Sequence, residues 1–195
     1  MLVDAGHVDE SRAAQQAGFQ LVDVRIELHR PTAAERAPVR EHREEDVEAL
    51  RAIARASHGD TRFYADPRFP RKRCDDLYDV WISRSCDGWA EAVLVPDEKG
   101  PAAGYVTVHV DEARQRGSIG LIAVAPEARG RGVGETLVRA AVDWCHGRAL
   151  REILVVTQGR NVNAQRVFQR CGFRTSTVGL WFHKWYPTPQ AVAAT

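Results

Sequence analysis

The stretch Arg129-Gly130-Arg131-Gly132-Val133-Gly134 decides how this chain of 195 residues is interpreted. It follows an apolar run, 119–125, that ends at Pro126, and it precedes a segment, 133–144, whose apolar residues recur at helical spacing. The predicted order is therefore strand, glycine-rich turn and helix. Alternating glycines let the backbone adopt conformations closed to other residues, and they let a ligand approach the main chain closely.

A turn of this kind predicts a seat for a pyrophosphate. The first N–H groups of a helix have no carbonyl partner within it, and the helix dipole adds positive potential there. Arg129 and Arg131 add positive charge beside the turn. The spacing is not a dinucleotide fingerprint, because that pattern needs a glycine where Glu135 stands, and no Gly-Lys-Ser/Thr follows to make a Walker loop.

Composition favours a single-domain enzyme in the cytoplasm. Lys and Arg number 27 against 26 Asp and Glu, so a strong basic excess for nucleic-acid binding is missing. No apolar run reaches the ~18 to 20 residues that span a bilayer, and the polar start of the chain predicts no signal peptide. The four cysteines are far apart and form no Cys-x-x-Cys pair, so we expect reduced thiols and no metal site. They are Cys74, Cys86, Cys145 and Cys171.

A second motif covers residues 161–173. Asn161 is a good N-cap for a helix, and Gly172 is a good stop after it. The plain interpretation is a capped helix that places Ala164, Phe168 and Cys171 on its core face. That interpretation does not explain why the unit follows a buried strand, 153–157, which itself follows the helix of the glycine-rich turn.

In this order the two motifs resemble motifs A and B of the GCN5-related N-acetyltransferases (GNAT). The resemblance implies an α/β (α+β) GNAT fold, with a central mixed, mostly antiparallel twisted sheet flanked by helices. It also implies acetyl-CoA as co-substrate, no metal, and a strand before the turn that pairs with the pantetheine arm. The residues it assigns to acetyl-CoA are Ile122, Ala123, Val124, Arg129, Gly130, Arg131, Gly132, Val133, Gly134 and Asn161.

Further segments resemble bacterial dTDP-fucosamine acetyltransferases. They are 15–24, 60–66, 77–82, 104–106 and 176–177 with Trp181. This resemblance implies that the acceptor is an amino group on a nucleotide-linked deoxysugar, and it makes Arg62, Asp66 and Tyr78 candidates for binding it. Arg62 and Asp66 lie on a long segment, and solvation of that loop is the plainer interpretation of both.

The resemblance and the order of the expected elements together imply three parts of the chain. These are a strand-helix-strand extension over 1–30, shortened relative to relatives and with its first strand at an open edge, a GNAT domain over 38–186, and a flexible tail over 187–195. We expect helices over 11–17, 44–57, 75–85 and 161–171, strands over 19–28, 39–41, 90–95, 103–110, 117–125 and 153–157, and two strands within 173–184. Residues 58–73 are expected to be irregular. The helix over 75–85 should bury Leu77, Val80, Trp81 and Ile82.

The catalytic groups are less obvious. The resemblance implies direct acyl transfer, with a backbone N–H near 122–124 polarising the thioester oxygen. It places the general-acid tyrosine of the family at Phe168, which cannot donate a proton. Tyr64, Tyr78 and Tyr105 are possible replacements. No glutamate stands in 118–121 to act as base, which leaves His109 and His183 as candidates, each with a structural or surface role as its alternative.

Three functions therefore compete. The first is an amino-sugar N-acetyltransferase. The second keeps the fold and acetyl-CoA but acts on a protein N-terminus, a small amine or an antibiotic. The third is a non-catalytic module that binds acyl-CoA. The expected partner is a small-molecule amine, with neither nucleic acid nor membrane, and a homodimer stays open.

Overall fold

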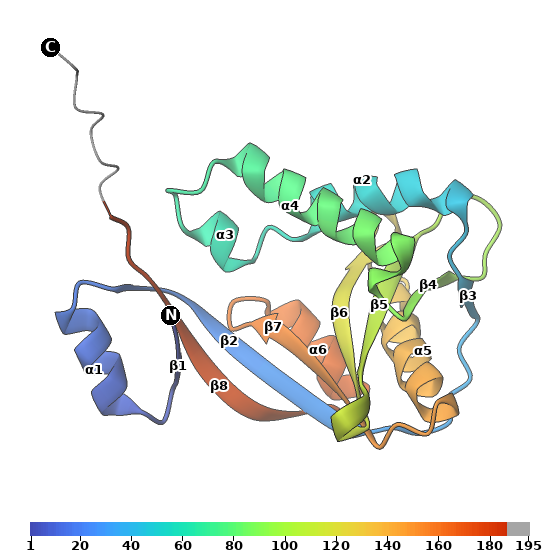
Figure 1. Ribbon diagram of the computed structural model, residues 1–195. Coiled ribbons are helices and arrows are strands. Elements are labelled where there is room, and N and C mark those ends of the chain that lie inside the picture. The colour runs from blue at the N-terminus through green and yellow to red at the C-terminus, as the bar shows by residue number, and fades with distance from the viewer. Residues whose placement is uncertain (187–195) are drawn as a thin grey trace, which may run out of the picture.

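A computed structural model describes residues 1–186 of the chain. Eight strands form one sheet in the order β1-β8-β2-β7-β6-β5-β4-β3 (Figure 1). Their bounds are β1 Leu2–Asp4, β2 Gln20–Pro31, β3 Val39–Glu41, β4 Ala92–Pro96, β5 Gly104–Asp111, β6 Arg116–Val124, β7 Glu152–Gln158 and β8 Arg174–His183. All neighbouring strands are antiparallel except β6 and β7, which are parallel. The predicted mixed, mostly antiparallel sheet is confirmed.

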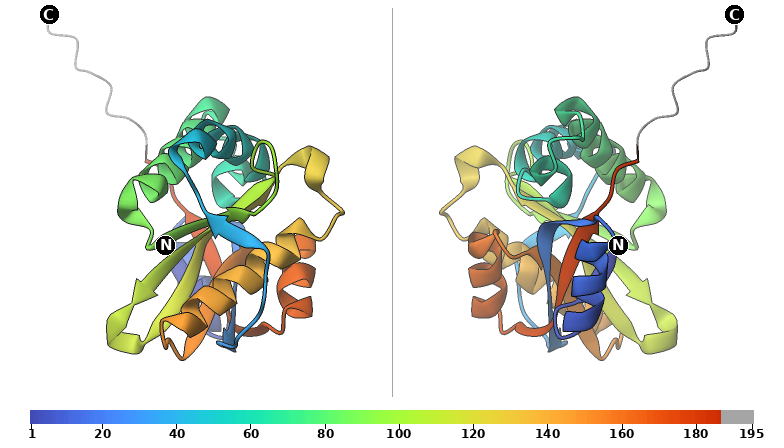
Figure 2. Two further views of the ribbon diagram at one scale, coloured as in Figure 1. Left: turned by 90° about the vertical axis from the view of Figure 1, so that its right-hand side faces the viewer. Right: turned by 90° about the vertical axis from the view of Figure 1, so that its left-hand side faces the viewer.

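Helices cover both faces of the sheet. Their bounds are α1 Val8–Gln16, α2 Val47–Ser57, α3 Arg62–Ala65, α4 Arg71–Arg84, α5 Val133–Gly147 and α6 Val162–Arg170. Figures 1 and 2 show α2, α3 and α4 together on one face, and α5 with α6 on the other. No described helix is long and apolar enough to cross a membrane.

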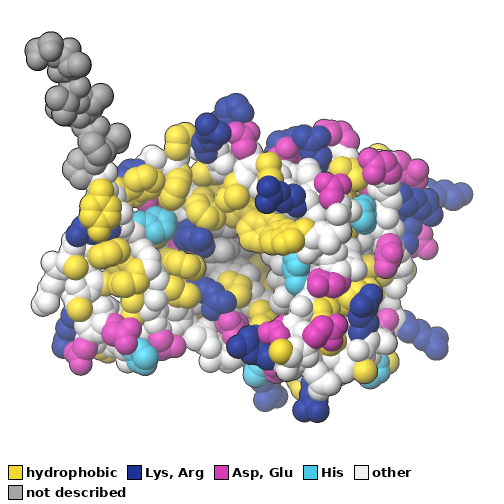
Figure 3. All heavy atoms as spheres, viewed as in Figure 1, with side chains coloured by type: hydrophobic (Ala, Val, Ile, Leu, Met, Phe, Trp, Pro, Cys, Tyr) yellow, Lys and Arg dark blue, Asp and Glu magenta, His cyan; other side chains and the backbone are white. Residues whose placement is uncertain are grey.

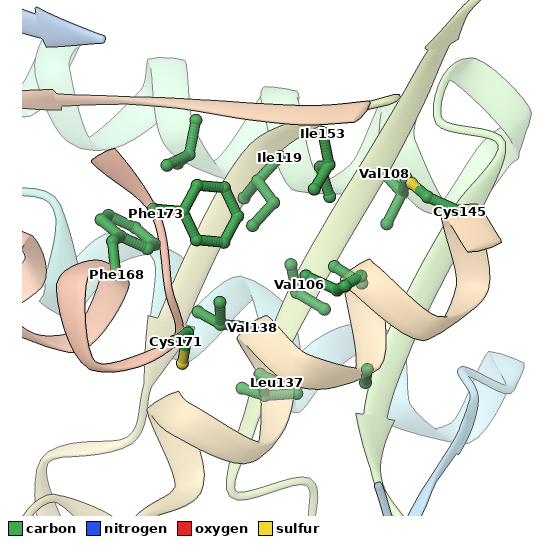
Figure 4. Close-up of a cluster of buried hydrophobic side chains, with 14 of the residues drawn as sticks. Val106, Val108, Ile119, Leu137, Val138, Cys145, Ile153, Phe168, Cys171 and Phe173 are labelled. Atoms are coloured by element: carbon green, nitrogen blue, oxygen red, sulfur yellow. The ribbon is translucent and has the colours of Figure 1, made fainter. Parts of the chain in front are cut away.

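The alternation of side chains along the strands builds a separate hydrophobic core on each face. Val106 and Val108 point toward α5, where they meet Leu137 and Val138 (Figure 4). Tyr105, one residue earlier on β5, points the other way, into the core beneath α2 and α4. A strand buried on both faces is mostly apolar, which is why β4 and the first half of β5 are almost entirely hydrophobic; Thr107 is the polar exception.

The sheet opens between β6 and β7. Their pairing extends from Arg116↔Glu152 to Ile119↔Val155, and both strands continue beyond it without pairing to each other. A bulge marks the same point on β6. Val108 pairs with Ile119 and Val106 with Ile122, so Thr107 faces two residues, and its Oγ1 accepts a hydrogen bond from the Leu121 N–H at 2.8 Å. Bulges re-aim side chains and end pairing, and here the strand edge beyond the bulge is left open.

The N-terminal segment contains β1, α1 and β2. β1 is an edge strand that pairs with β8, and α1 packs with Ala14 on Phe182. β2 lies between β8 and β7, so this segment contributes to the middle of the sheet. The predicted tail over 187–195 lies outside the described residues.

Three expectations about elements are wrong. Residues 173–184 hold one strand, β8, instead of two, because β8 is paired on both sides, with β1 and β2. The segment 58–73 is not wholly irregular, since it contains α3 and the start of α4. Leu77 and Val80 are exposed, because α4 turns the stripe Cys74, Tyr78 and Ile82 toward the core. The spacing 74, 78, 82 is itself helical, and the tyrosine in it is the buried member that a purely apolar count misses.

Candidate active site

The glycine-rich turn has the backbone conformation that the sequence predicts. Gly130 and Gly132 have φ values of 77° and 83°, in the left-handed region that side chains with a Cβ rarely adopt. A Cβ at either position would meet no atom within 4 Å. The left-handed backbone conformation, and the space left for a ligand to approach the main chain, therefore explain these two glycines. Crowding by neighbouring protein atoms does not.

The turn presents unpaired donors to the outside. The backbone N–H groups from Gly130 to Glu135 find no acceptor among the described residues, and Gly132, the N-cap of α5, receives no side-chain cap. Arg129 and Arg131 bond to a hydroxyl and to carbonyl oxygens, and neither pairs with a described carboxylate. Consecutive free N–H groups at a helix N-terminus, next to two cations, form a site for a phosphate or pyrophosphate.

A groove of about 630 Å³ runs from this turn to α6. Its lining includes nine of the ten residues predicted for acetyl-CoA: Ile122, Ala123, Val124, Arg129, Gly130, Gly132, Val133, Gly134 and Asn161. Arg131, the tenth, lies outside the lining. Asn161 caps α6, because its Oδ1 accepts the Ala164 N–H at 3.1 Å.

The open edge of β6 forms one side of this groove. The Ala125 N–H donates to Ala103 O, just beyond the end of the β5–β6 ladder. Backbone N–H groups alternate in direction along a strand, so those of Ile122 and Val124 point into the gap between β6 and β7. An extended chain of amide groups could pair with this edge as an added strand. The groove and the turn thus fit the two polar parts of acetyl-CoA, its pantetheine arm and its pyrophosphate.

Phe168 forms part of the groove wall, and its ring packs 5.9 Å from that of Phe173. Three tyrosines suggested as replacement acids lie instead on the α2–α4 side of the sheet, each in a hydrogen bond. Tyr64 donates to Asp75, Tyr78 donates to Thr61, and Tyr105 bonds to His58. Burial raises the pKa of all three hydroxyls. No described tyrosine lines the groove.

The opposite face of the sheet is hollowed between the α3–α4 helices and the long strands, with hydrophobic and basic side chains around the hollow (Figure 3). Arg62 lies on this face. Its guanidinium carbon is 4.1 Å from the centre of the Trp181 ring and 4.3 Å from that of Phe63. Arg62 has no ion pair among the described residues, whereas nearby Asp23 is buried and pairs with Arg160 at 3.3 Å. Burial lowers the pKa of the Arg62 guanidinium, so it is a partly desolvated, unpaired cation.

Asp66 and His183, two other predicted site residues, bond to each other. His183 Nδ1 lies 2.7 Å from Asp66 Oδ2, and the same oxygen accepts the Trp185 indole N–H at 2.8 Å. These bonds lower the pKa of the Asp66 carboxyl despite its burial. They join the segment after α3 to the end of β8, which gives both residues a structural task.

A layer of aromatic side chains lies on the α2–α4 side of the sheet, and sequence reasoning found only part of it. Tyr78 stacks on His58 with ring centres 4.4 Å apart and on Trp81 at 6.0 Å. Trp89 packs against Trp81 and against His109, yet more than half of it is exposed. The indole N–H of Trp81 is buried without an acceptor among the described residues. Trp89, which follows a predicted helix, is the one signal in the sequence for this layer. No sequence pattern shows that residues 58, 81, 89 and 109 lie together.

Comparisons with known proteins agree with this geometry. The profile of the Acetyltransferase (GNAT) family matches residues 47–173. The chain is 28% identical to the dTDP-fucosamine acetyltransferase of Escherichia coli O6:H1 over 93% of its own length and 79% of that protein. It is 26% identical to the spore coat polysaccharide biosynthesis protein SpsD of Bacillus subtilis, over 72% of its own length and 48% of that protein. It is also 27% identical to the mycothiol acetyltransferase of Rhodococcus opacus, over 82% of its own length and 56% of that protein.

Solved structures share the fold. A GCN5-related N-acetyltransferase from Sphaerobacter thermophilus superposes with a TM-score of 0.65 at 18% identity, covering 93% of this chain and 57% of that one. The chain spans about half the length of the second and third relatives named above.

Proposed function

The chain belongs to the GNAT family of acetyltransferases (EC 2.3.1), and on that premise we propose that it acetylates a primary amine of a nucleotide-linked amino sugar. The family implies acetyl-CoA as donor and a small-molecule acceptor. The finer assignment of the acceptor draws on similarity to the dTDP-fucosamine enzyme and on the unpaired guanidinium of Arg62 over Trp181.

On the donor side, this chain's residues bind and orient. The N–H groups of 130–135 would hold the pyrophosphate, and the open edge of β6 would hold the pantetheine arm as an added strand. The N–H groups of Ile122 and Val124 would then be available to polarise the thioester carbonyl, as donors of an oxyanion hole do. Much of the rate gain comes from holding amine and thioester in line, because orientation supplies several kcal/mol. Acetyl-CoA itself supplies the activated acetyl group.

Arg62 is the observation that carries the acceptor class. A planar guanidinium that is stacked on Trp181, partly desolvated and without an ion pair among the described residues suits a phosphate, which it can contact through two N–H groups at once. A nucleotide-linked sugar carries a diphosphate next to its sugar ring, whereas a free amino sugar or most antibiotics carry none. A peptide N-terminus offers no phosphate either.

The test compares acceptors that differ in this feature. Acetyl transfer is measured by thiol release with a dTDP-linked 4-amino sugar, the same free amino sugar, a peptide N-terminus and an aminoglycoside. We expect kcat/KM for the dTDP-linked sugar to exceed that for the free sugar by about 100-fold, and Arg62→Gln to remove most of the difference, since charged hydrogen bonds are worth about 1.5–3 kcal/mol. Arg68→Gln, on the exposed loop after α3, is the matched control and should retain it.

Three results would contradict the proposal. Equal kcat/KM for free and nucleotide-linked sugars would remove the argument from Arg62. A preference for the peptide or the aminoglycoside would favour the second family function. CoA binding without thiol release for any amine would favour the non-catalytic module.

A further inference from the structure

His109 lies at the point where the sheet opens. It pairs with Ser118 across β5 and β6, and its side chain is on the α2–α4 face together with Thr107. Its ring rests over Gly120, where a Cβ would lie only 2.5 Å from His109 Nε2. Gly120 therefore leaves the space that the imidazole occupies, which explains why no side chain stands at this position of β6.

Gly120 is also the first residue of β6 after the last pair with β7, and it belongs to the bulge. Ile122, whose N–H points into the gap, is two residues further on, a distance of about 7 Å along a strand. The imidazole therefore lies over β6, about two residues along the strand from the N–H group of Ile122 that we propose to face the thioester carbonyl. Its side chain is on the α2–α4 face of the sheet, opposite to α5.

The surroundings of His109 suit a base that is neutral in the resting protein. Glu91 Oε2 is 3.8 Å from its Nδ1, and the Trp89 ring packs against it with ring centres 5.1 Å apart. Burial lowers the pKa of His109, while Glu91 and a backbone hydrogen bond at Trp89 oppose that shift.

Other charges near His109 are compensated. Asp111, on the same strand, pairs with Arg114 at 2.9 Å, and Arg116, on β6, lies 3.9 Å from Glu152. Among the described carboxylates, Glu91 alone comes within 4 Å of the ring. No carboxylate stands on β6 from Ser118 to Val124 to do the same work.

We propose that His109 is the general base that accepts the proton of the attacking amine, and that Glu91 positions its imidazole and stabilises the imidazolium. The amine nitrogen forms a bond to the carbonyl carbon, and the carbon–sulfur bond breaks with its electron pair leaving on sulfur. The proton released from nitrogen goes to His109, and from there to water or to the thiolate. The products are the acetamide and free CoA thiol, so atoms and charge balance.

This proposal rests on the acetyl transfer stated above but not on the identity of the acceptor, and its test uses whichever amine gives the fastest thiol release. His109→Ala should lower kcat/KM by about 100-fold, a usual size for general-base catalysis. It should also remove the acid limb of the pH profile, and added imidazole should restore activity in part. Acetyl-CoA affinity, measured by calorimetry, should stay within about twofold, because the side chain is on the other face.

A second measurement observes the imidazole directly and compares its titration with the pH profile of activity. An NMR titration of the His109 imidazole should follow the acid limb of the wild-type profile, and Glu91→Gln should move both to lower pH, because loss of the carboxylate removes a charge that favours the imidazolium. His29→Ala, an exposed histidine on β2, is the control and should leave rate and profile unchanged.

An unchanged pH profile in a folded His109→Ala protein, or an NMR titration that does not respond to Glu91→Gln, would overturn the proposal. Acetylation of a peptide or antibiotic instead of a sugar nucleotide would refute the proposed acceptor and leave the assignment of His109 standing. A wild-type protein that acetylates no amine would refute both.

Discussion

The two faces of the sheet offer different parts of the chain for the binding that we propose. On the α5 face, the donors are backbone N–H groups of one continuous segment, 130–135, and glycines keep side chains out of their way. On the α4 face, the polar and aromatic groups are side chains from separate elements: Arg62, Trp81, Trp89 and His109. A backbone site suits one unvarying donor molecule. A site built of side chains can be altered for another acceptor without changing the turn.

The largest effect on the proposed backbone site should come from adding a negative charge to it. Gly132→Asp places a carboxylate at the N-terminus of α5, where we propose that the pyrophosphate binds, and a like charge at ~4 Å costs up to about 4 kcal/mol at an effective dielectric of ~20. We expect calorimetry to show CoA binding weakened by about 100-fold or more. Gly132→Ala is the matched control. It carries the same cost of about 1–2 kcal/mol for a Cβ in the left-handed conformation, but it adds no charge.

If Gly132→Ala weakens CoA binding as much as Gly132→Asp in a folded protein, the backbone conformation matters and the anion site does not. If neither variant changes the affinity, the turn is not the binding site.

The side-chain face should respond to pH where the backbone face does not. His58 is packed between Tyr78 and Tyr105, and its burial lowers its pKa from 6.5 to about 4. The unfolded chain then binds the proton more readily than the folded one, so stability is complete above pH 6.5 and is lost as pH falls toward 4. At about 1.4 kcal/mol for each pKa unit, the loss from this residue reaches roughly 3 kcal/mol.

His58→Gln keeps a group that can bond to the Tyr105 hydroxyl and removes the titration. Its free energy of unfolding, measured in urea at several pH values, should fall less steeply between pH 6.5 and 4 than that of the wild type. His146→Gln, an exposed histidine near the end of α5, should follow the wild-type curve. Parallel curves for His58→Gln and wild type would mean that His58 is not buried as a neutral group.

The same contrast explains what the sequence could predict. The turn, its conformation and the capped helix at Asn161 are written in adjacent residues, so local chemistry was sufficient to find them. The β6 bulge, the space over Gly120 and the pair His109–Glu91 depend on register between strands, which no local pattern fixes. Asp66 and His183 looked like site residues separately, and only their pairing across the fold gives them a structural task.

Phe168 is a side chain in the groove wall on the α5 face, so it tests whether this face depends on backbone groups alone. The family resemblance places an acid tyrosine there, and no described tyrosine lines the groove instead. Phe168→Tyr should raise steady-state thiol release by about tenfold, less than the ~100-fold or more that general-acid catalysis can supply, because other steps then limit turnover. Phe173→Tyr, also buried in the same core, is the control and should not raise it. A flat or lower rate in a folded Phe168→Tyr protein would show that departure of the thiolate does not limit turnover.

The smallest expected effect concerns Asn161, whose side chain caps α6 and also lines the groove. Asn161→Asp retains the cap and suits the helix dipole, so the free energy of unfolding should not fall. It adds a negative charge at the solvent-exposed groove, worth about 1 kcal/mol at ~4 Å in water, and CoA affinity should drop by about fivefold. Asn161→Ser, a neutral cap, should bind CoA like the wild type. Because the charge is exposed, the difference between the Asp and Ser variants should shrink as salt is raised. Equal CoA affinities of the Asp and Ser variants at low salt would mean that Asn161 only caps α6. The Asn161 side chain would then take no part in binding on this face.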